Sequence, residues 1–321
     1  MNPLWLNAVR AAAGAVPSGT PLYTVTTTGA QTHNIASLGV SAATTVYWGD
    51  GNSDIYTGTA ARSHAYAGAG TWVVSVDEPL YVTTLNLNDN KITLNSADVA
   101  AMANVIDFRV YSLKAGTFDS ADVSAWRPAV FYLYSMPTGY AGTFDSADVS
   151  AWRPSSFHLH SMPAGYAGTF NSADVSAWQP AYFYLHSMPT GYAGTFDSAD
   201  VSAWQPAYFY LHSMPAGYAI TAGGGFANWS TTVNFYVQNN GLTAGTVDAI
   251  LWELYQASTV PRTASGGTIN ISDSNAAPSG TYQAATSCPV TVATPGKEIA
   301  HELKNDGCAV GFNKWTTVTT S

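Results

Sequence analysis

The stretch FYLHSMPTGYAGTFDSADVSAWQPAY, residues 183–208, is one of several near-identical copies in this 321-residue chain. Almost the same string begins again at Phe209, and the tryptophans that mark its register are 26 residues apart at every step. A fixed period of about 20–30 residues predicts a solenoid of stacked, similar units, each of which we call a rung. The marker tryptophans are Trp126, Trp152, Trp178 and Trp204.

Each rung contains an alternating run that predicts a strand. In VFYLYS, Phe131 and Leu133 alternate with Tyr132 and Tyr134, which is the period of a half-buried strand. Looser copies flank the strict ones, so the alignment extends to about eight rungs. The aligned inward positions are Leu87, Val110, Leu133, Leu159, Leu185, Leu211, Val237 and Ile271.

A short helix is expected after each strand. In FDSADVSAW, Asp119 is predicted to cap a helix that begins at Ser120, and Asp122 stands where a carboxylate reaches back in a capping box. The flanking apolar residues have the spacing of a hydrophobic staple, and Pro128 is expected to end the helix. The looser copies have the same pattern of staple and capping residues, at Leu94, Asn95, Asp98 and Val99, and at Leu242, Thr243 and Val247.

LNLNDNKIT at residues 85–93 resembles the leucine-rich-repeat consensus LxLxxNxL, and NFYVQNNGLT at 234–243 echoes it. The tail, from LTAGTVDAILWEL to KWTTVTT, is similar to the closing segment of repeat proteins of bacteria and their phages. The resemblance implies a leucine-rich-repeat-like solenoid over 80–240 and a C-terminal repeat and cap over 241–321. The strict copies depart from the consensus, because Ser-Met-Pro replaces the asparagine region.

TTVYWGDGNSDIYTGTAARSHAYAGAGTWVVSV at residues 44–76 is similar to polycystic-kidney-disease-type Ig-like domains. The resemblance implies a small Ig-like β-sandwich over 18–79, and Asp50-Gly51 is a hairpin-turn signal in its own right. A module of about 60 residues is expected to lean on the first rung for burial. The matching residues are Trp48, Gly49, Asp50, Gly51, His64, Tyr66, Gly70, Thr71 and Trp72.

The composition excludes some partners. The net charge is −9 and the 11 basic residues do not cluster, so we expect no nucleic-acid groove. No run of about 18 apolar residues occurs, so we expect no membrane insertion. The segment 1–17 is mildly apolar but lacks the basic region of a secretory signal, and is interpreted as a docking element.

The two cysteines, Cys288 and Cys308, lie near the C-terminus. Two interpretations are open: one disulfide that closes a loop of about 20 residues, or two buried free thiols. Neither cysteine has the spacing of a metal site, and no cofactor is expected.

The outward strand positions form two columns if this register holds. Neighbouring strands lie about 4.8 Å apart, so each column stacks rings at that spacing. Three interpretations compete: a self-stabilising ladder, a binding surface for a protein or glycan, and a metal site at the three stacked histidines, which lacks a carboxylate or thiolate. The first column is Tyr132, His158, Tyr184 and Tyr210, and the second is Tyr134, His160, His186 and His212.

An enzyme is not expected, because the chain has no G-x-S-x-G elbow, P-loop or H-E-x-x-H motif. Repeated identical units favour an extended surface, whereas catalysis needs unlike groups that converge. The methionines of the repeat are interpreted as core filler and the DSAD aspartates as caps. These methionines are Met136, Met162, Met188 and Met214.

We therefore expect a non-catalytic structural or adhesive protein displayed on a phage virion, as a decoration or fibre-type component. The alternatives are a secreted or surface-anchored bacterial adhesin and a glycan-binding module. The expected partners are other virion or surface proteins, or a protein or glycan of the host surface. Homo-oligomerisation is left open.

Overall fold

The computed structural model describes residues 19–259, 266–305 and 314–321. The protein is mostly β with few helices and has a large, mostly parallel sheet. It comprises two compact units, Met1–Thr143 and Phe144–Ser321, which are taken in turn below. The predicted docking element at 1–17 lies outside the described residues.

The first unit begins with four antiparallel strands. β1 pairs with β4 along its whole length, and β2 pairs with β3. Bulges in the long strand β2 let it also pair with β5 (Val82–Leu87), and β1 pairs with β6 (Ile92–Asn95). The small β module therefore pairs with the strands that follow it, as expected from its size. The four strands are β1 (Thr20–Thr28), β2 (Gln31–Tyr47), β3 (Ser53–Tyr66) and β4 (Ala69–Val76).

The residues of the WGDG motif form the hairpin turn and a packed cluster. Gly51 in the turn between β2 and β3 has a φ of 94°, a conformation that glycine adopts without strain. Asp50 Oδ2 lies 2.8 Å from His64 Nε2, and the His64 ring stacks on Trp48 at 4.8 Å. The Tyr66 hydroxyl donates to the Trp48 carbonyl at 2.9 Å. The turn prediction is confirmed, and the spaced motif residues meet in one place.

The first unit continues with parallel strands in register. Leu87 of β5 pairs with Val110 of β7, and Val110 pairs with Leu133 of β9. A second strip of short strands runs beside them, with β6 pairing β8. The remaining elements are η1 (Pro79–Tyr81), α2 (Ser96–Val99), β7 (Asp107–Tyr111), β8 (Ala115–Thr117), η2 (Ser120–Val123), β9 (Val130–Tyr134) and β10 (Gly142–Thr143), where η marks a 3₁₀ helix.

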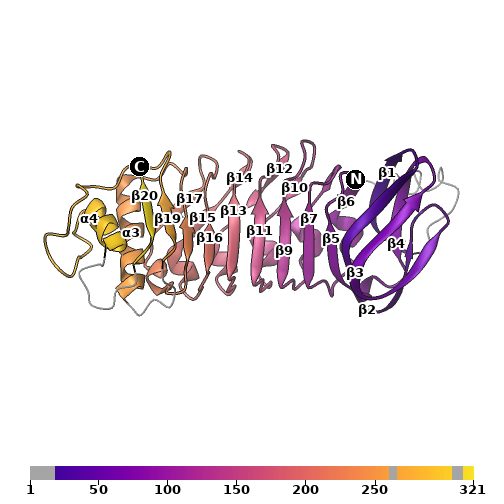
Figure 1. Ribbon diagram of the computed structural model, residues 1–321, viewed down its shortest axis with the longest axis horizontal. Helices are drawn as coiled ribbons and strands as arrows, with labels where there is room; N and C mark the ends of the chain where they lie inside the picture. Colours follow the sequence, from indigo (N-terminus) through magenta and orange to yellow (C-terminus); the bar gives the residue numbers. More distant parts are fainter. Residues whose placement is uncertain (1–18, 260–265, 306–313) are drawn as a thin grey trace. The chain divides into compact units, whose positions relative to one another are not determined.

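The second unit is built on one parallel sheet whose strands run side by side in Figure 1. Phe183 pairs with Phe157 and Phe209, so the 26-residue spacing puts equivalent residues next to each other. The final strand was not among the aligned rungs. The sheet order is β11 (Ser156–His160), β13 (Tyr182–His186), β16 (Tyr208–Tyr210), β18 (Asn234–Tyr236), β19 (Thr268–Ile271) and β20 (Thr317–Thr320).

Short strands and helices complete each rung of the second unit. β12 pairs with β14 and β15 pairs with β17, all in parallel. Two longer helices, α3 and α4, lie near the C-terminus (Figure 1). The elements are η3 (Ser146–Val149), β12 (Tyr166–Thr169), η4 (Ser172–Val175), β14 (Tyr192–Ala193), β15 (Thr195–Asp197), η5 (Ser198–Val201), β17 (Ala219–Thr221), η6 (Gly225–Asn228), α3 (Ala244–Thr259) and α4 (Gly296–Asn305).

The core of each rung repeats the same side chains. Phe183 and Leu185 from β13 are fully buried, together with Phe196 and Trp204 further along the repeat. The Phe183 ring lies 5.7 Å from Phe157 and 5.5 Å from Phe209, so rungs stack ring on ring. The four methionines of the repeat are also buried, which confirms their interpretation as core filler.

Most of the capping predictions were wrong, although Asp197 does cap its own 3₁₀ turn, since its Oδ1 accepts from the Ala199 N–H at 2.9 Å. Asp145 does not accept a bond from its own helix; its Oδ1 accepts from the backbone N–H of Thr169 in the next rung, at 2.8 Å. Asp119 bonds Thr143 N in the same way. The helices are single 3₁₀ turns that end well before the proline. Thr243 does cap α3, since its Oγ1 accepts from Thr246 N at 3.2 Å.

The DSAD serine links each rung to the next. The buried Ser172 Oγ accepts from the backbone N–H of Asp197 at 2.8 Å and donates to the Asp200 carboxylate at 2.6 Å. Ser146 makes the same pair of bonds to the following rung, at 2.9 and 2.5 Å. In the first unit, Ser96 does so as well. The motif that looked like a cap is therefore an inter-rung hydrogen-bond ladder.

Glu253 of α3 ends this ladder. Ser198 Oγ donates to Glu253 Oε2 at 2.9 Å, in the role that an aspartate plays for the other serines. The same carboxylate accepts from the backbone N–H groups of Gly224 at 2.6 Å and Phe226 at 3.0 Å. Burial raises the pKa of Glu253, although these three hydrogen bonds oppose the shift. Phe226 stands 26 residues after Asp200, so the next rung offers no aspartate to Ser198 and α3 supplies the carboxylate instead.

Deletion of residues 167–192 should leave a folded protein, shorter by about one strand spacing, ~4.8 Å. The new junction restores the repeat, because Ser146 then meets the Asp197 amide and the Asp200 carboxylate in place of its present partners. Deletion of 167–179, half a repeat, is the control and should misfold. Circular dichroism and thermal melting test both; an aggregating product from the whole-repeat deletion would contradict the stacked-rung architecture.

Replacing Ser172 by alanine should lower the free energy of unfolding by roughly 1–3 kcal/mol, because a buried N–H and a carboxylate lose their shared partner. Ser202→Ala, at a half-buried serine outside the ladder, should change it by much less. Urea denaturation of the two variants measures the difference. Equal effects would show that the ladder does not stabilise the stack.

Candidate binding surface

The outward strand positions of the second unit hold the predicted residues. Tyr184 and His186 on β13 are half-buried, whereas Phe183 and Leu185, which alternate with them, are fully buried. The same alternation holds in the neighbouring rungs, so the predicted register is confirmed. We call these outward rings the tyrosine column (His158, Tyr184 and Tyr210) and the histidine column (His160, His186 and His212).

Rings within each column stack face to face. His186 lies 4.3 Å from both His160 and His212, with interplanar angles of 14° and 13°. In the tyrosine column, Tyr184 lies 4.1 Å from His158 and 4.4 Å from Tyr210. The faces therefore cover one another, and the columns present ring edges. This surface offers hydroxyls and imidazole nitrogens rather than open aromatic faces.

The tyrosine column extends further than predicted, because Tyr236 of β18 stacks on Tyr210 at 4.5 Å. The signal was present in the sequence, since the copy FYVQN at 235–239 was aligned with the strict repeats. The predicted column nevertheless ended at Tyr210 and did not include the outward tyrosine of this copy.

The first unit has its own outward rings on β9, Tyr132 and Tyr134. Tyr134 stacks on Tyr111 of β7 at 4.9 Å, and the guanidinium of Arg109 lies 5.1 Å from the Tyr132 ring centre. Arg109 and Tyr111 were missed, although the aligned copy FRVYS at 108–112 contains both.

A serine follows each histidine and fixes its ring. His186 Nδ1 lies 3.2 Å from the Oγ of Ser187, and the same distance recurs at His160 and His212. These serines adopt left-handed backbone, with φ of 53° at Ser187. The looser copies place Asn239 and an aspartate there, residue types that tolerate this conformation better. The same left-handed serine follows Tyr111 and Tyr134, at Ser112 and Ser135, so it belongs to the turn after the strand and does not depend on the histidine.

The histidine column is uncharged at neutral pH. Burial first, and the neighbouring imidazoles second, lower the pKa of His160 to about 4 and of His186 to about 3. Burial also lowers the pKa of His212, which Asp273 partly opposes. Three cations at this spacing would repel one another strongly. The surface is polar but carries no charge from these rings.

The other candidate groups have different roles. Among the described residues, no three His, Cys, Asp or Glu side chains gather as a metal site. Cys288 is disulfide-bonded, and Cys308 lies outside the described residues, so their pairing stays a prediction. Glu298 and Glu302 both lie on α4. Glu298 accepts from the Gln283 amide and Glu302 from the Ala285 N–H, and these bonds hold the loop before the helix.

Comparison with known proteins adds no assignment: no protein-family model, curated protein or solved structure matches the chain. Within the described ranges, no helix has the length and apolar character to cross a membrane. The functional argument therefore depends on the surface itself.

Acidification should destabilise the protein through the histidine column. Because the folded-state pKa values lie below the ordinary 6.5, the unfolded chain binds more protons, and the free energy of unfolding falls as pH drops from about 6.5 toward 4. Exchanging His160, His186 and His212 for tyrosine should reduce this loss. Urea denaturation at pH 7.5 and 5 measures it.

His301→Gln, at a histidine on α4 outside the columns, is the matched control and should leave the pH dependence close to that of the unaltered chain. Carboxylate titration, including that of Glu253, is common to the unaltered chain and the triple variant and cancels between them, whereas His301→Gln also removes the contact of His301 with Glu302. An equal loss of stability in the triple variant would contradict the neutral, buried state of the column.

Proposed function

We propose that residues 80–240 form a leucine-rich-repeat-like solenoid with a C-terminal cap, and that 18–79 form an Ig-like β-sandwich. In-register parallel strands support the solenoid. Asn240 and Asn275 support the likeness, because both side-chain amides donate to the Val237 carbonyl, at 2.9 Å. Asn240 stands where the strict copies carry methionine, 26 residues after Met214. The packed cluster of Trp48, His64 and Tyr66 supports the Ig-like part.

The function proposed for this architecture is non-catalytic: a structural or adhesive protein displayed on a phage virion, as a decoration or fibre-type component. The observation that carries the proposal is the pair of outward ring columns, repeated in register along one sheet. An extended surface of identical groups suits a large partner, since binding is spread over many equal contacts.

The chemistry of the columns favours a protein partner. Sugars usually pack on the open face of an aromatic ring, and stacked rings cover those faces. Hydroxyl and imidazole edges instead suit the polar and backbone groups of a protein surface. Because the imidazoles are neutral, little charge must be desolvated when such a partner covers them.

The location of the protein tests the proposal most directly. Mass spectrometry of purified particles, culture medium and cell envelope should find the chain in the particle fraction. Recovery only from the envelope or the medium would favour the bacterial adhesin instead.

Disrupting the columns should weaken attachment without unfolding the protein. The His160, His186 and His212 to tyrosine variant keeps a ring in every rung, so its stability at pH 7.5 should stay within about 1 kcal/mol. Attachment to particle or host should fall, and it should fall again after Tyr184→Ser with Tyr210→Ser. Tyr282→Ser, at an exposed tyrosine outside the columns, is the control. Normal attachment by both variants would exclude the columns as the functional face.

A further inference from the structure

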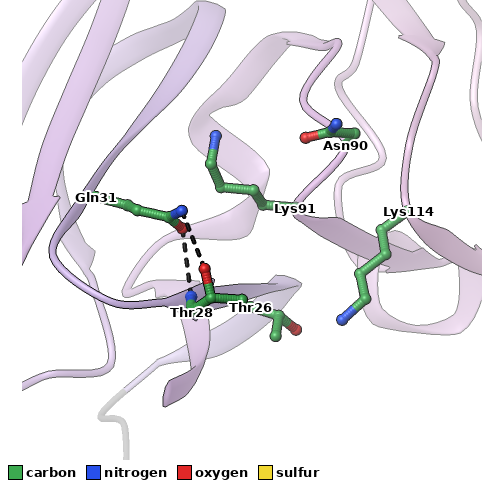
Figure 2. Close-up of a pocket in the computed structure, with 6 residues that line it drawn as sticks. All are labelled: Thr26, Thr28, Gln31, Asn90, Lys91 and Lys114. Atoms are coloured by element: carbon green, nitrogen blue, oxygen red, sulfur yellow. Dashed lines mark hydrogen bonds between the residues drawn. The ribbon is translucent and has the colours of Figure 1, made fainter. Parts of the chain in front are cut away.

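A pocket of about 280 Å³ lies in the first unit, and every residue that lines it is of a polar or charged type. Three turns build it: the β1–β2 hairpin, the turn between β5 and β6, and the turn before β8 (Figure 2). The sequence analysis did not single out any of these residues. The lining residues are Thr26, Thr28, Gln31, Asn90, Lys91 and Lys114.

Backbone hydrogen bonds hold the three turns in place. The Thr26 N–H donates to the Lys91 carbonyl at 2.9 Å, and the Lys114 N–H donates to the Ile92 carbonyl at 2.9 Å. Gln31 closes the hairpin, because its amide group donates to the Thr28 hydroxyl and its oxygen accepts from the Thr28 N–H. The pocket is therefore built on paired strand ends rather than on a long loop.

The pocket concentrates positive charge on an acidic protein. Two of the five lysines in the sequence line it, while the whole chain carries −9. Lys91 Nζ lies 3.0 Å from Asp89, which also meets His33 at 3.1 Å. Within the described part of the chain, no carboxylate lies within 4.0 Å of the Lys114 ammonium. One lysine is thus neutralised and the other is not.

Burial and hydrogen bonds set the charge of Asp89 and His33, which lie beside the pocket. Burial opposes ionisation of Asp89, but hydrogen bonds from Lys91 and His33 outweigh it and lower the pKa of the carboxyl. Burial lowers the pKa of His33, so this imidazole is neutral at pH 7. With Asp89 negative and both lysines positive, the pocket keeps one net positive charge.

We propose that this pocket binds the anionic group of a surface sugar, with Lys114 as its main charged contact and the Thr26 and Thr28 hydroxyls and the Asn90 amide as hydrogen-bond partners. Ammonium groups bind carboxylate or phosphate as compact point charges. The pocket has no aromatic wall, so a neutral sugar has no ring to stack on. Its volume is at the lower end for ligand sites and suits one sugar residue.

The proposal rests on the proposed role in surface attachment, but it involves other residues. Loss of sugar binding in a protein that still attaches through the ring columns would reject this pocket alone. Loss of attachment by the column variants with sugar binding retained would reject the columns alone.

The experiment is a titration of the full chain, followed by NMR, with glucuronate, glucose 1-phosphate and glucose as probes. We expect binding of at least one anionic probe and none of glucose, with weaker binding at higher salt. Lys114→Gln should weaken that binding about tenfold or more, as expected for loss of a charged hydrogen bond. Lys304→Gln removes the same charge from an exposed position on α4 and should have no effect.

Which anionic probe binds distinguishes a carboxylate-bearing from a phosphate-bearing sugar. The proposal is overturned if neither anionic probe binds at 20 mM (about 2 kcal/mol of binding free energy). It is also overturned if glucose binds equally well, or if Lys114→Gln and Lys304→Gln behave alike.

Discussion

A buried serine hydroxyl between successive rungs is the interaction on which the repeated part of this fold depends. Burial of the phenylalanines disfavours a slip by one residue, which would turn every one of them to solvent. The serine adds a second and directional constraint on the register, because it must meet both an amide and a carboxylate of the next copy. The phenylalanine stack, the methionine filler and the outward rings all follow from this register.

The same register gives the outward surface its character. Rings placed one strand spacing apart stack on each other, and burial, followed by the effect of the neighbouring imidazoles, lowers the pKa of His186. The result is a polar, uncharged face on an acidic protein. Positive charge is found instead at Lys91 and Lys114, which line one pocket of the first unit.

Periodicity predicted much of the architecture. The 26-residue spacing and the alternation in VFYLYS identified the strands, their pairing and the eight outward rings, because those features depend only on local sequence. The DSAD aspartates were predicted mostly wrongly as helix caps. A cap and an inter-rung hydrogen bond need the same residue types, and they differ only in which backbone amide the carboxylate meets. The pocket could not be predicted, because Thr26, Lys91 and Lys114 come from separate turns with no common motif. Tyr236 and Arg109 were predictable from the looser copies aligned with the repeat, but the predicted columns did not include them.

Glu253 has a consequence for how such a chain can change over time. The junctions after Ser146 and Ser172 use the same pair of serine and aspartate, whereas Ser198 meets the glutamate of α3. A gene with near-identical segments gains or loses them readily by unequal recombination. In this chain, the contact at α3 would stay the same after such a change, because the Glu253 carboxylate meets an identical serine whatever the number of copies before it. The length of the repeat array can therefore change by whole repeats, while the N-terminal and C-terminal parts of the chain are selected separately.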